Sequence, residues 1–326
     1  MKNDQPRVAA EYRPSSLWQG ILDRAYAPLA DAARADDLAG FHFFLANFGA
    51  WKDYLAIESS TLIQEYARSP LKRRYLQEVV FGRQLSMWQW FHGGQTSLSR
   101  LSYPTFGNQS GAFIDGVFVG PGSFDNEIYG SLLTGIVDGQ TRPTIAELGA
   151  GYGKLAYFFL RDLSAFTYVD FDLPEVLSVA AYYLIRSFPE RRALLYGEAP
   201  YTPDVHVDHE LVFMPSWEIE RLGADSVDLF VNKNSLGEMT RASAVRYVNV
   251  ICGSTRYFFH INHEWMRNLF GGNESSLLAS EYPVPPERFA LLVRYPDFGH
   301  LFWRGYLDFK SDIFFYLYGR RSGGQA

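Results

Sequence analysis

The sequence has one cysteine, Cys252, and lacks any run of about 18 apolar residues long enough for a membrane-spanning helix. A single thiol excludes an intrachain disulfide framework and is typical of a reducing compartment. The opening residues, MKNDQP, also lack the apolar core of a secretory signal. We therefore expect a soluble, cytoplasmic protein with no membrane partner.

An excess of basic charge is absent as well. The 326 residues include 30 Lys and Arg against 36 Asp and Glu, which gives a net charge of -6. Nucleic-acid binding normally needs a positive footprint, so we expect no nucleic-acid partner. Aromatic residues, by contrast, make up 17% of the chain. They are consistent with a ring-lined cavity or simply with a bulky core.

The most informative segment present is 145–154, IAELGAGYGK. An apolar lead-in ends at Glu147, and glycines follow at alternate positions, Gly149, Gly151 and Gly153, before a helical pattern. This order predicts a strand, a tight turn and a helix N-terminus, which brings bare backbone close to a nucleotide-like ligand. The third glycine comes one residue too early for the dinucleotide spacing G-x-G-x-x-G.

The acid in this motif helps to choose the ligand. A carboxylate two residues before the first glycine suits a cation better than a pyrophosphate. S-adenosylmethionine carries a sulfonium and an ammonium and no phosphate. The segment therefore predicts a binding site for this methyl donor.

The rest of the chain divides into segments that differ in residue pattern and composition. Apolar residues three and four apart predict helices over 17–95. A stretch rich in glycine and proline, 103–122, predicts a loop with a small hairpin that turns at Asp115 and Gly116. A helix is expected at 126–137.

Strand and helix signals alternate from residue 144 onward, which favours a parallel sheet covered on both faces. Helices are expected at 173–187 and 243–252, among other places. The predicted fold is α/β, a doubly wound, seven-stranded, mostly parallel sheet like that of class I methyltransferases. We expect 1–125 to form a mainly helical lid region with the hairpin, and 126–326 the donor-binding domain. The strand candidates are 144–148, 167–171, 211–214, 227–232, 256–261, 289–293 and 312–318.

The second strand ends in two acids. A carboxylate at this place can accept hydrogen bonds from both ribose hydroxyls. We prefer Asp172, which lies before a proline that ends the strand, and expect Asp170 to point to the other side. The alternative role for Asp172 is to cap the helix that begins near Leu173.

The third strand is followed by residues suited to adenine. Met214, Pro215 or Trp217 could sandwich the flat base, and Ser216 could bond to a ring nitrogen or to the exocyclic amine. An aromatic residue after a strand is more often part of the core. Its place after the third strand is what favours the functional interpretation.

Polar residues also follow the fourth and fifth strands, where open sheets bind their ligands. Asn234 and Ser235 are placed to reach the methionine end of the donor, and Glu238 to face the acceptor. Ser235 and Glu238 could instead form a helix capping box. At the fifth strand, His260, His263 and Glu264 are candidates for the base that deprotonates a hydroxyl.

A further cluster, DVHVDHE at 204–210, has metal-ligand spacing if it lies on a strand. It precedes the third strand, on the edge away from the expected crevice. We interpret it as a polar edge segment and expect no metal.

Five motifs together resemble the sugar O-methyltransferases, a bacterial family that includes tailoring enzymes of deoxysugar-bearing natural products. The likeness spans roughly residues 100–262, and the motifs agree in order. They are ELGAGYGKLA at 147–156, DLPEVL at 172–177, YYL at 182–184, DLFVNKNSLGEM at 228–239 and YPTFGN at 103–108.

The resemblance implies S-adenosylmethionine as donor and a sugar hydroxyl as acceptor. One departure concerns the base: plant small-molecule O-methyltransferases keep a histidine where this chain has Gly237. We therefore expect the catalytic residues to be Glu238 first, then His263 and His260. The expected donor-binding residues are Glu147, Gly149, Gly151, Gly153, Asp172, Leu173, Pro215, Ser216, Trp217, Asn234 and Ser235.

Other interpretations stay open at this point. Asn108 and His92 of the lid region are outside candidates for the base. The acceptor could be a non-sugar hydroxyl, an amine or a peptide, or the chain could bind the donor without turnover. The sequence names neither the sugar nor the oligomeric state, for which a homodimer is one alternative.

Overall fold

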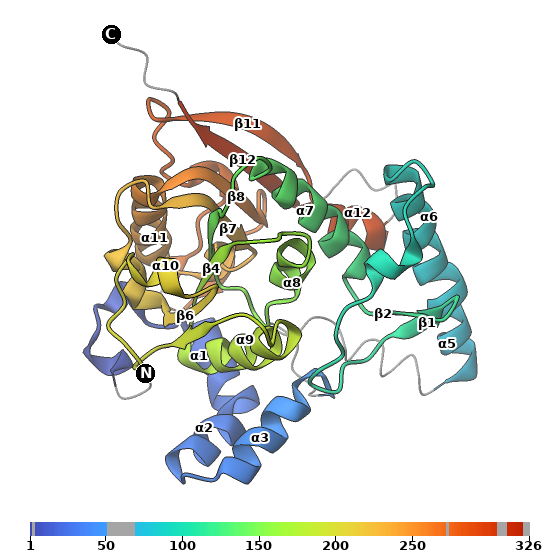
Figure 1. The fold of residues 1–326 in the computed structure, drawn as a ribbon, viewed down its shortest axis with the longest axis horizontal. Coiled ribbons are helices and arrows are strands. Elements are labelled where there is room, and N and C mark those ends of the chain that lie inside the picture. The colour runs from blue at the N-terminus through green and yellow to red at the C-terminus, as the bar shows by residue number, and fades with distance from the viewer. Residues whose placement is uncertain (2–3, 51–68, 272–273, 305–311, 322–326) are drawn as a thin grey trace.

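The computed structural model describes residues 1, 4–50, 69–271, 274–304 and 312–321, and its centre is an eight-stranded sheet (Figure 1). Strand β12 is antiparallel to both of its neighbours, whereas the pairs among the other strands are parallel. In spatial order the strands are β11 (Phe289–Pro296), β12 (Ile313–Arg320), β8 (Thr255–His263), β7 (Val227–Lys233), β3 (Thr144–Leu148), β4 (Thr167–Asp172), β6 (Leu211–Pro215) and β5 (Ala193–Leu195).

The predicted fold class is confirmed. All seven expected strands are present, and every residue of β4 and β6 is buried, as expected for strands covered on both faces. The number of strands was wrong by one, because β5 adds an eighth strand at the edge. With three residues and a half-exposed pattern, β5 is too short to give a periodic signal.

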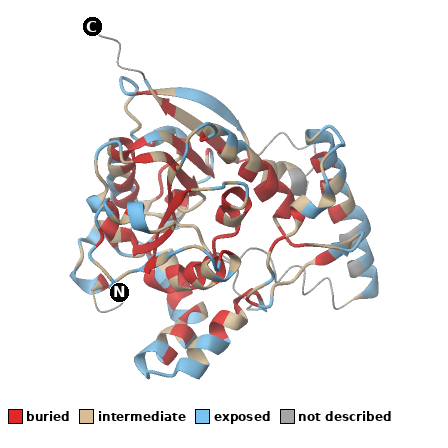
Figure 2. Ribbon diagram, in the orientation of Figure 1, coloured by how far each residue is buried: buried red, intermediate tan, exposed pale blue. Residues whose placement is uncertain are grey.

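Helices cover both faces of the sheet. Alternate residues of β3 face opposite layers: Ile145 packs with α7 (Ser123–Ile136), α8 (Lys154–Leu160) and α9 (Pro174–Ser187), and Ala146 packs with α11 (Arg241–Ser254). The most buried part of the molecule is this layered centre (Figure 2).

The chain reverses its direction of travel across the sheet at β3. From β3 it proceeds through β4 to the β6 side, and it then returns to the opposite side of β3 with β7 and β8. The carboxyl ends of β3 and β7 therefore border a topological switch point. Open α/β sheets bind their ligands at such a point.

The N-terminal region is mainly helical where it is described, and the predicted hairpin is present, with Asp115 and Gly116 at its turn. Its helices lie to one side of the sheet and below it in Figure 1. Part of the region predicted to be helical, 51–68, lies outside the described residues. The elements of this region are α1 (Ser16–Ala25), α2 (Ala27–Arg34), α3 (Leu38–Ala46), α5 (Pro70–Tyr75), the π-helical η4 (Leu76–Phe81), α6 (Gly82–Phe91), β1 (Ala112–Ile114) and β2 (Val117–Val119).

The segment 204–210, whose metal-ligand spacing depended on a strand, does not form one. Its centre is a short helix, in which buried His206 bonds to the Tyr201 hydroxyl at 3.1 Å. Nowhere in the described chain do three His, Cys, Asp or Glu side chains gather as metal ligands. The helices that the structure describes are all too short or too polar to cross a bilayer.

The remaining elements are short connections. They are η1 (Gln5–Arg7), η2 (Ala10–Tyr12), η3 (Phe48–Ala50), η5 (Leu98–Leu101), α10 (Val205–Asp208), η6 (Ser216–Arg221), η7 (Leu236–Glu238), β9 (Leu269–Phe270), β10 (Glu274–Ser275), η8 (Ala279–Glu281) and α12 (Phe298–Arg304).

Candidate functional site

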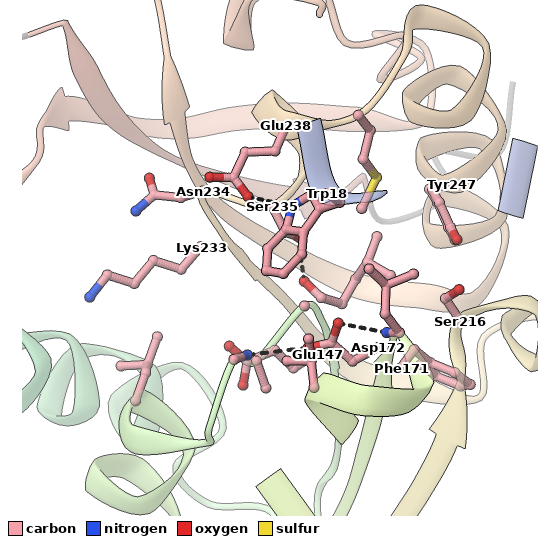
Figure 3. A pocket seen from close by; sticks show the side chains of 18 of the residues that line it. Trp18, Glu147, Phe171, Asp172, Ser216, Lys233, Asn234, Ser235, Glu238 and Tyr247 are labelled. Carbon is pink, nitrogen blue, oxygen red and sulfur yellow. Dashed lines mark hydrogen bonds between the residues drawn. The ribbon is translucent and has the colours of Figure 1, made fainter. Parts of the chain in front are cut away.

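A cavity of about 640 Å³ lies at the carboxyl ends of β3, β4 and β7 (Figure 3). Volumes of this size are typical of small-molecule sites. The segments that line it are separated in sequence and come from the N-terminal region, the glycine turn, the ends of β4 and β7, and the chain around α12. The cavity therefore brings together most of the motifs that the sequence singled out.

The glycine turn forms the floor of this cavity. Gly149 and Gly151 line it with φ of 76° and 64°, values that favour glycine. A Cβ on Gly149 would lie 2.4 Å from the side chain of Ser235, so the approach of the two segments needs a glycine. Gly153 does not line the cavity: it caps α8, and a Cβ there would lie 2.8 Å from Leu184.

Asp172 is the acid of β4 that reaches the cavity. Its carboxylate accepts hydrogen bonds from the amides of Leu173 at 2.7 Å and Gly151 at 3.3 Å. Leu173, which also lines the cavity, is itself the N-cap residue of α9, so Asp172 is not the cap. Burial raises the pKa of Asp172, and nearby Glu147 and Glu238 add to the rise.

We had expected Asp170 to point to the other side of the strand from Asp172, and this expectation was wrong. It lies two residues before Asp172, on the same side of the strand, but it is fully buried and outside the cavity lining. Burial raises its pKa, and repulsion from Asp172 and Glu147 raises it further. Three carboxyl groups thus crowd beneath the glycine turn.

Glu147 is buried and lines the cavity at the end of β3. It accepts a hydrogen bond from the Tyr168 hydroxyl at 2.8 Å. Burial raises its pKa to about 7, although this bond and the charge of Lys233 act in the other direction. The site therefore holds carboxylates that a cationic ligand would stabilise.

Amide and hydroxyl groups fix the segment after β7. Ser235 donates to the Leu148 carbonyl at 2.8 Å, and Asn232 donates to the same carbonyl at 2.8 Å. Asn262 of β8 completes the network by donating to Asn232 at 2.9 Å. Ser235 makes no side-chain cap, so the capping box is not formed.

Asn234 lines the cavity in a strained backbone conformation. Its φ is 67°, which is uncommon for a residue with a side chain and clusters at functional sites. Its buried side-chain oxygen accepts no hydrogen bond from the described residues. A ligand N–H or O–H would satisfy this oxygen.

At one end of the cavity lie Phe171, Ser216 and Tyr247 (Figure 3). The hydroxyl and the two rings suit a flat, polar-edged base. Pro215 and Trp217 do not line the cavity; Trp217 packs on Tyr196, at 6.2 Å between ring centroids. Met214 is buried in the core.

The N-terminal segment covers Glu238. The Trp18 indole donates to Glu238 Oε2 at 2.8 Å, and the Ser15 hydroxyl donates to the Glu238 carbonyl at 2.9 Å (Figure 3). Burial raises the pKa of Glu238 to about 7, against the effect of the Trp18 bond. Residues 11–15 and Trp18 also line the cavity. Part of the lid region thus meets the sheet at the site.

His263 lines the cavity beside Glu238 and is paired with Asp312 through Nδ1. The Asp312 carboxylate also accepts from the amides of Trp265 at 2.7 Å and Met266 at 2.9 Å. Burial raises the pKa of Asp312, but these hydrogen bonds outweigh it and hold the pKa below its usual value. Asp312 is therefore a charged partner that fixes the imidazole of His263.

His260 and Glu264 are not part of this site. His260 is fully buried and stacks on Tyr316, at 4.8 Å between ring centroids, and burial lowers its pKa to about 3. Glu264 pairs with Arg294. His92 bonds to Glu127 at 2.6 Å, and Asn108 to Asn47 at 3.1 Å, also away from the cavity.

The end of the cavity opposite Tyr247 is polar. Lys233 bonds to Asn126 at 2.8 Å and to Asp125 at 3.1 Å. Asp297 lies nearby and accepts from the Tyr129 hydroxyl at 2.7 Å. Sequence reasoning did not find these residues, nor Trp18, Tyr247 and Asp312. The one available signal was the polar pair Asn232 and Lys233, which follows the apolar run of β7.

The sequence matches no family model and no curated protein. Its fold is similar to three solved structures among others: the mitomycin 7-O-methyltransferase MmcR (12% identity, TM-score 0.38), the glycopeptide N-methyltransferase MtfA complexed with sinefungin (13%, 0.38) and a TehB-like S-adenosylmethionine-dependent methyltransferase from Corynebacterium glutamicum (12%, 0.38). The matches cover 61%, 61% and 60% of this chain, and 55%, 87% and 89% of those proteins. At such low identity, reaction and substrate must be argued from the site itself.

Proposed function

We propose that this chain is an S-adenosylmethionine-dependent O-methyltransferase that acts on a sugar hydroxyl. One observation carries the proposal: the buried carboxylates of Glu147 and Asp172 meet the glycine turn in a single cavity at the switch point of the sheet. Buried carboxylates are stabilised by positive charge, and this donor provides a sulfonium and an ammonium.

The residues present fit this donor. Asp172 is placed to bind the ribose hydroxyls, and Ser216 and Tyr247 would border the adenine. Asn234, with its unsatisfied oxygen, and Glu147 would hold the methionine end. The donor supplies an electrophilic methyl group when bound.

The base is best assigned to His263. Because Nδ1 is engaged by Asp312, Nε2 is the nitrogen available to take the proton from an acceptor hydroxyl. The ring lies beside Gly237: a Cβ there would be 3.4 Å from Cδ2 of His263, an ordinary van der Waals contact. A histidine thus reaches the site from β8, whereas plant relatives place one after the preceding strand.

Glu238 is the second group at the acceptor side. With a pKa near 7 it can both accept and donate a hydrogen bond at neutral pH, so it suits orientation of the acceptor hydroxyl. The polar end of the cavity around Lys233, Asp125 and Asn126 suits a polyhydroxyl acceptor better than a flat apolar one. These features support the sugar assignment suggested by the sequence motifs.

The test has two stages. Calorimetry first measures binding of S-adenosylmethionine and S-adenosylhomocysteine to the wild type and to Asp172→Ala, with Asp162→Ala, a surface acid, as control. Methyl transfer to a panel of glycosides, aromatic alcohols and amines is then followed with a labelled donor. Failure to bind either donor form would contradict the whole proposal. Donor binding without transfer to any acceptor would point to a scaffold.

A further inference from the structure

The charges lining the cavity restrict the acceptor, on the premise of the proposed function. Among the described lining residues, six carry carboxylates and three carry a permanent cation. Burial raises the pKa values of Glu147, Asp172 and Glu238, so these three are not all ionised at neutral pH, but their protonated forms add no positive charge that could hold an anion. The acids are Glu11, Asp125, Glu147, Asp172, Glu238 and Asp297.

Each of the three cations has partners within the protein. Lys233 bonds to Asp125 and Asn126. Lys154 donates to the Pro121 carbonyl and lies 4.2 Å from the centre of the Tyr103 ring. Arg13 donates to the carbonyls of Pro6 and Val8 at 2.9 Å each. Their positive charge is thus already directed to groups of the chain itself.

Two carboxylates border the polar end at one point. A Cβ added to Gly299 would lie 2.9 Å from Asp297 Oδ2 and 3.3 Å from Asp125 Oδ2. Both residues are buried, at 5% and 6% exposure. Asp125 is paired with Lys233, so the charge that a phosphate or carboxylate would meet here is that of Asp297, at low dielectric, where repulsion is strong.

We propose that the acceptor carries no phosphate and that its reacting sugar is uncharged or bears a protonated amine. Sugars are activated as nucleoside diphosphates, which carry negative charge next to the sugar. The cavity would reject that form. Methylation then follows glycosyl transfer: a glycosyltransferase supplies the substrate by moving the sugar from its nucleotide to an aglycone.

The experiment compares one sugar in three forms: its nucleoside diphosphate, its methyl glycoside and the methyl glycoside with an amine replacing one hydroxyl. Binding to the full chain loaded with S-adenosylhomocysteine is measured by calorimetry, and methyl transfer is measured in parallel. Because like-charge contacts oppose binding, we expect the nucleotide form to bind about 100-fold more weakly than the glycosides. Equal or tighter binding of the nucleotide form would overturn the inference.

Two variants test whether the lining charges cause the difference in affinity between the nucleotide and glycoside forms. One lining charge is removed in each of Asp125→Asn and Glu11→Gln. Each variant should narrow the gap, meaning the ratio of the Kd of the nucleotide form to the Kd of the glycosides. Glu190→Gln removes the same charge from an exposed site outside the cavity and should leave the gap unchanged. An equal gap in all three variants would overturn the electrostatic argument. If S-adenosylhomocysteine fails to bind, the proposed function fails, whereas nucleoside diphosphate binding to the unloaded chain still decides the charge preference.

Discussion

At the scale of single residues, the pairing of His263 with Asp312 supports the proposal that His263 is the base. The two residues are 49 positions apart, and no local pattern connects them. In the proposed mechanism this pairing would orient the ring for proton transfer. Glu238, the first choice from the sequence, instead contacts the Trp18 indole.

We predict that His263→Ala lowers kcat by about 10²- to 10⁴-fold, the usual contribution of a general base, and leaves the affinity for S-adenosylhomocysteine unchanged. Asp312→Asn should lower kcat less, because the ring loses the carboxylate that orients it. Steady-state kinetics across pH, with donor binding by calorimetry, measures both effects. A wild-type kcat in His263→Ala would return the role of base to Glu238.

Gly149 provides a second prediction at this scale. Gly149→Ala places a side chain at φ of 76° and within 2.4 Å of Ser235. We expect it to lower the free energy of unfolding by about 1–3 kcal/mol and to weaken donor binding. In the double variant with Ser235→Gly, the clash is removed but the backbone strain is kept, so recovery should be partial. Chemical denaturation measures this, and a fully stable single variant would contradict the argument.

At the scale of elements, the start of α1 contacts the site. Trp18 and Ser15 both bond to Glu238, and Tyr12 packs against Tyr247 of α11, at 5.3 Å between ring centroids. The short segment before and within α1 thus contacts both Glu238 and the Tyr247 end of the cavity. The predicted role of the N-terminal region as a lid rests on these contacts and stays a prediction, as does the domain boundary at 125.

Trp18→Phe tests this contact with little change of shape. The indole bond lowers the pKa of Glu238, so its loss should raise that pKa above about 7. A larger fraction of Glu238 is then protonated at neutral pH, and the pH-rate profile should shift to higher pH. Trp90→Phe, at an indole that is 75% exposed, is the matched control. An unchanged profile in Trp18→Phe would show that Glu238 does not take part in turnover.

At the scale of the whole molecule, the buried carboxyls link stability to pH and donor. The pKa of Glu147 is raised from 4.5 to about 7 in the folded state. The folded state therefore holds a proton that the unfolded state loses, and stability falls as pH rises between these values. One such group lowers the free energy of unfolding by about 3 kcal/mol across this window.

We predict that the free protein is less stable at pH 8 than at pH 5.5, and that donor affinity rises over the same range because ionised Glu147 and Asp172 pair with the cationic donor. Melting temperatures with and without S-adenosylmethionine, measured across pH, test both directions. Glu147→Gln should flatten the dependence of the free protein. Donor affinity that falls as pH rises would contradict the cationic pairing.

Several features of the fold follow from local pattern. Buried parallel strands are apolar runs bounded by polar residues, and all seven expected runs are strands. The hairpin turn at Asp115 and Gly116 follows from turn chemistry. The edge strand β5 was not predicted, because three residues give no period. The short helix within 204–210 was not predicted either, because polar alternation suits a strand or a helix.

The sequence by itself determined the glycine turn, the order of the strands and the acids at their ends, because each depends on neighbours along the chain. Only the tertiary structure decided which of these groups share a cavity. It placed Asp172 there and His260 on the far side of its strand, and it joined His263 to Asp312 and Glu238 to Trp18. Such contacts depend on packing between distant segments, and burial then sets the pKa values that the chemistry uses.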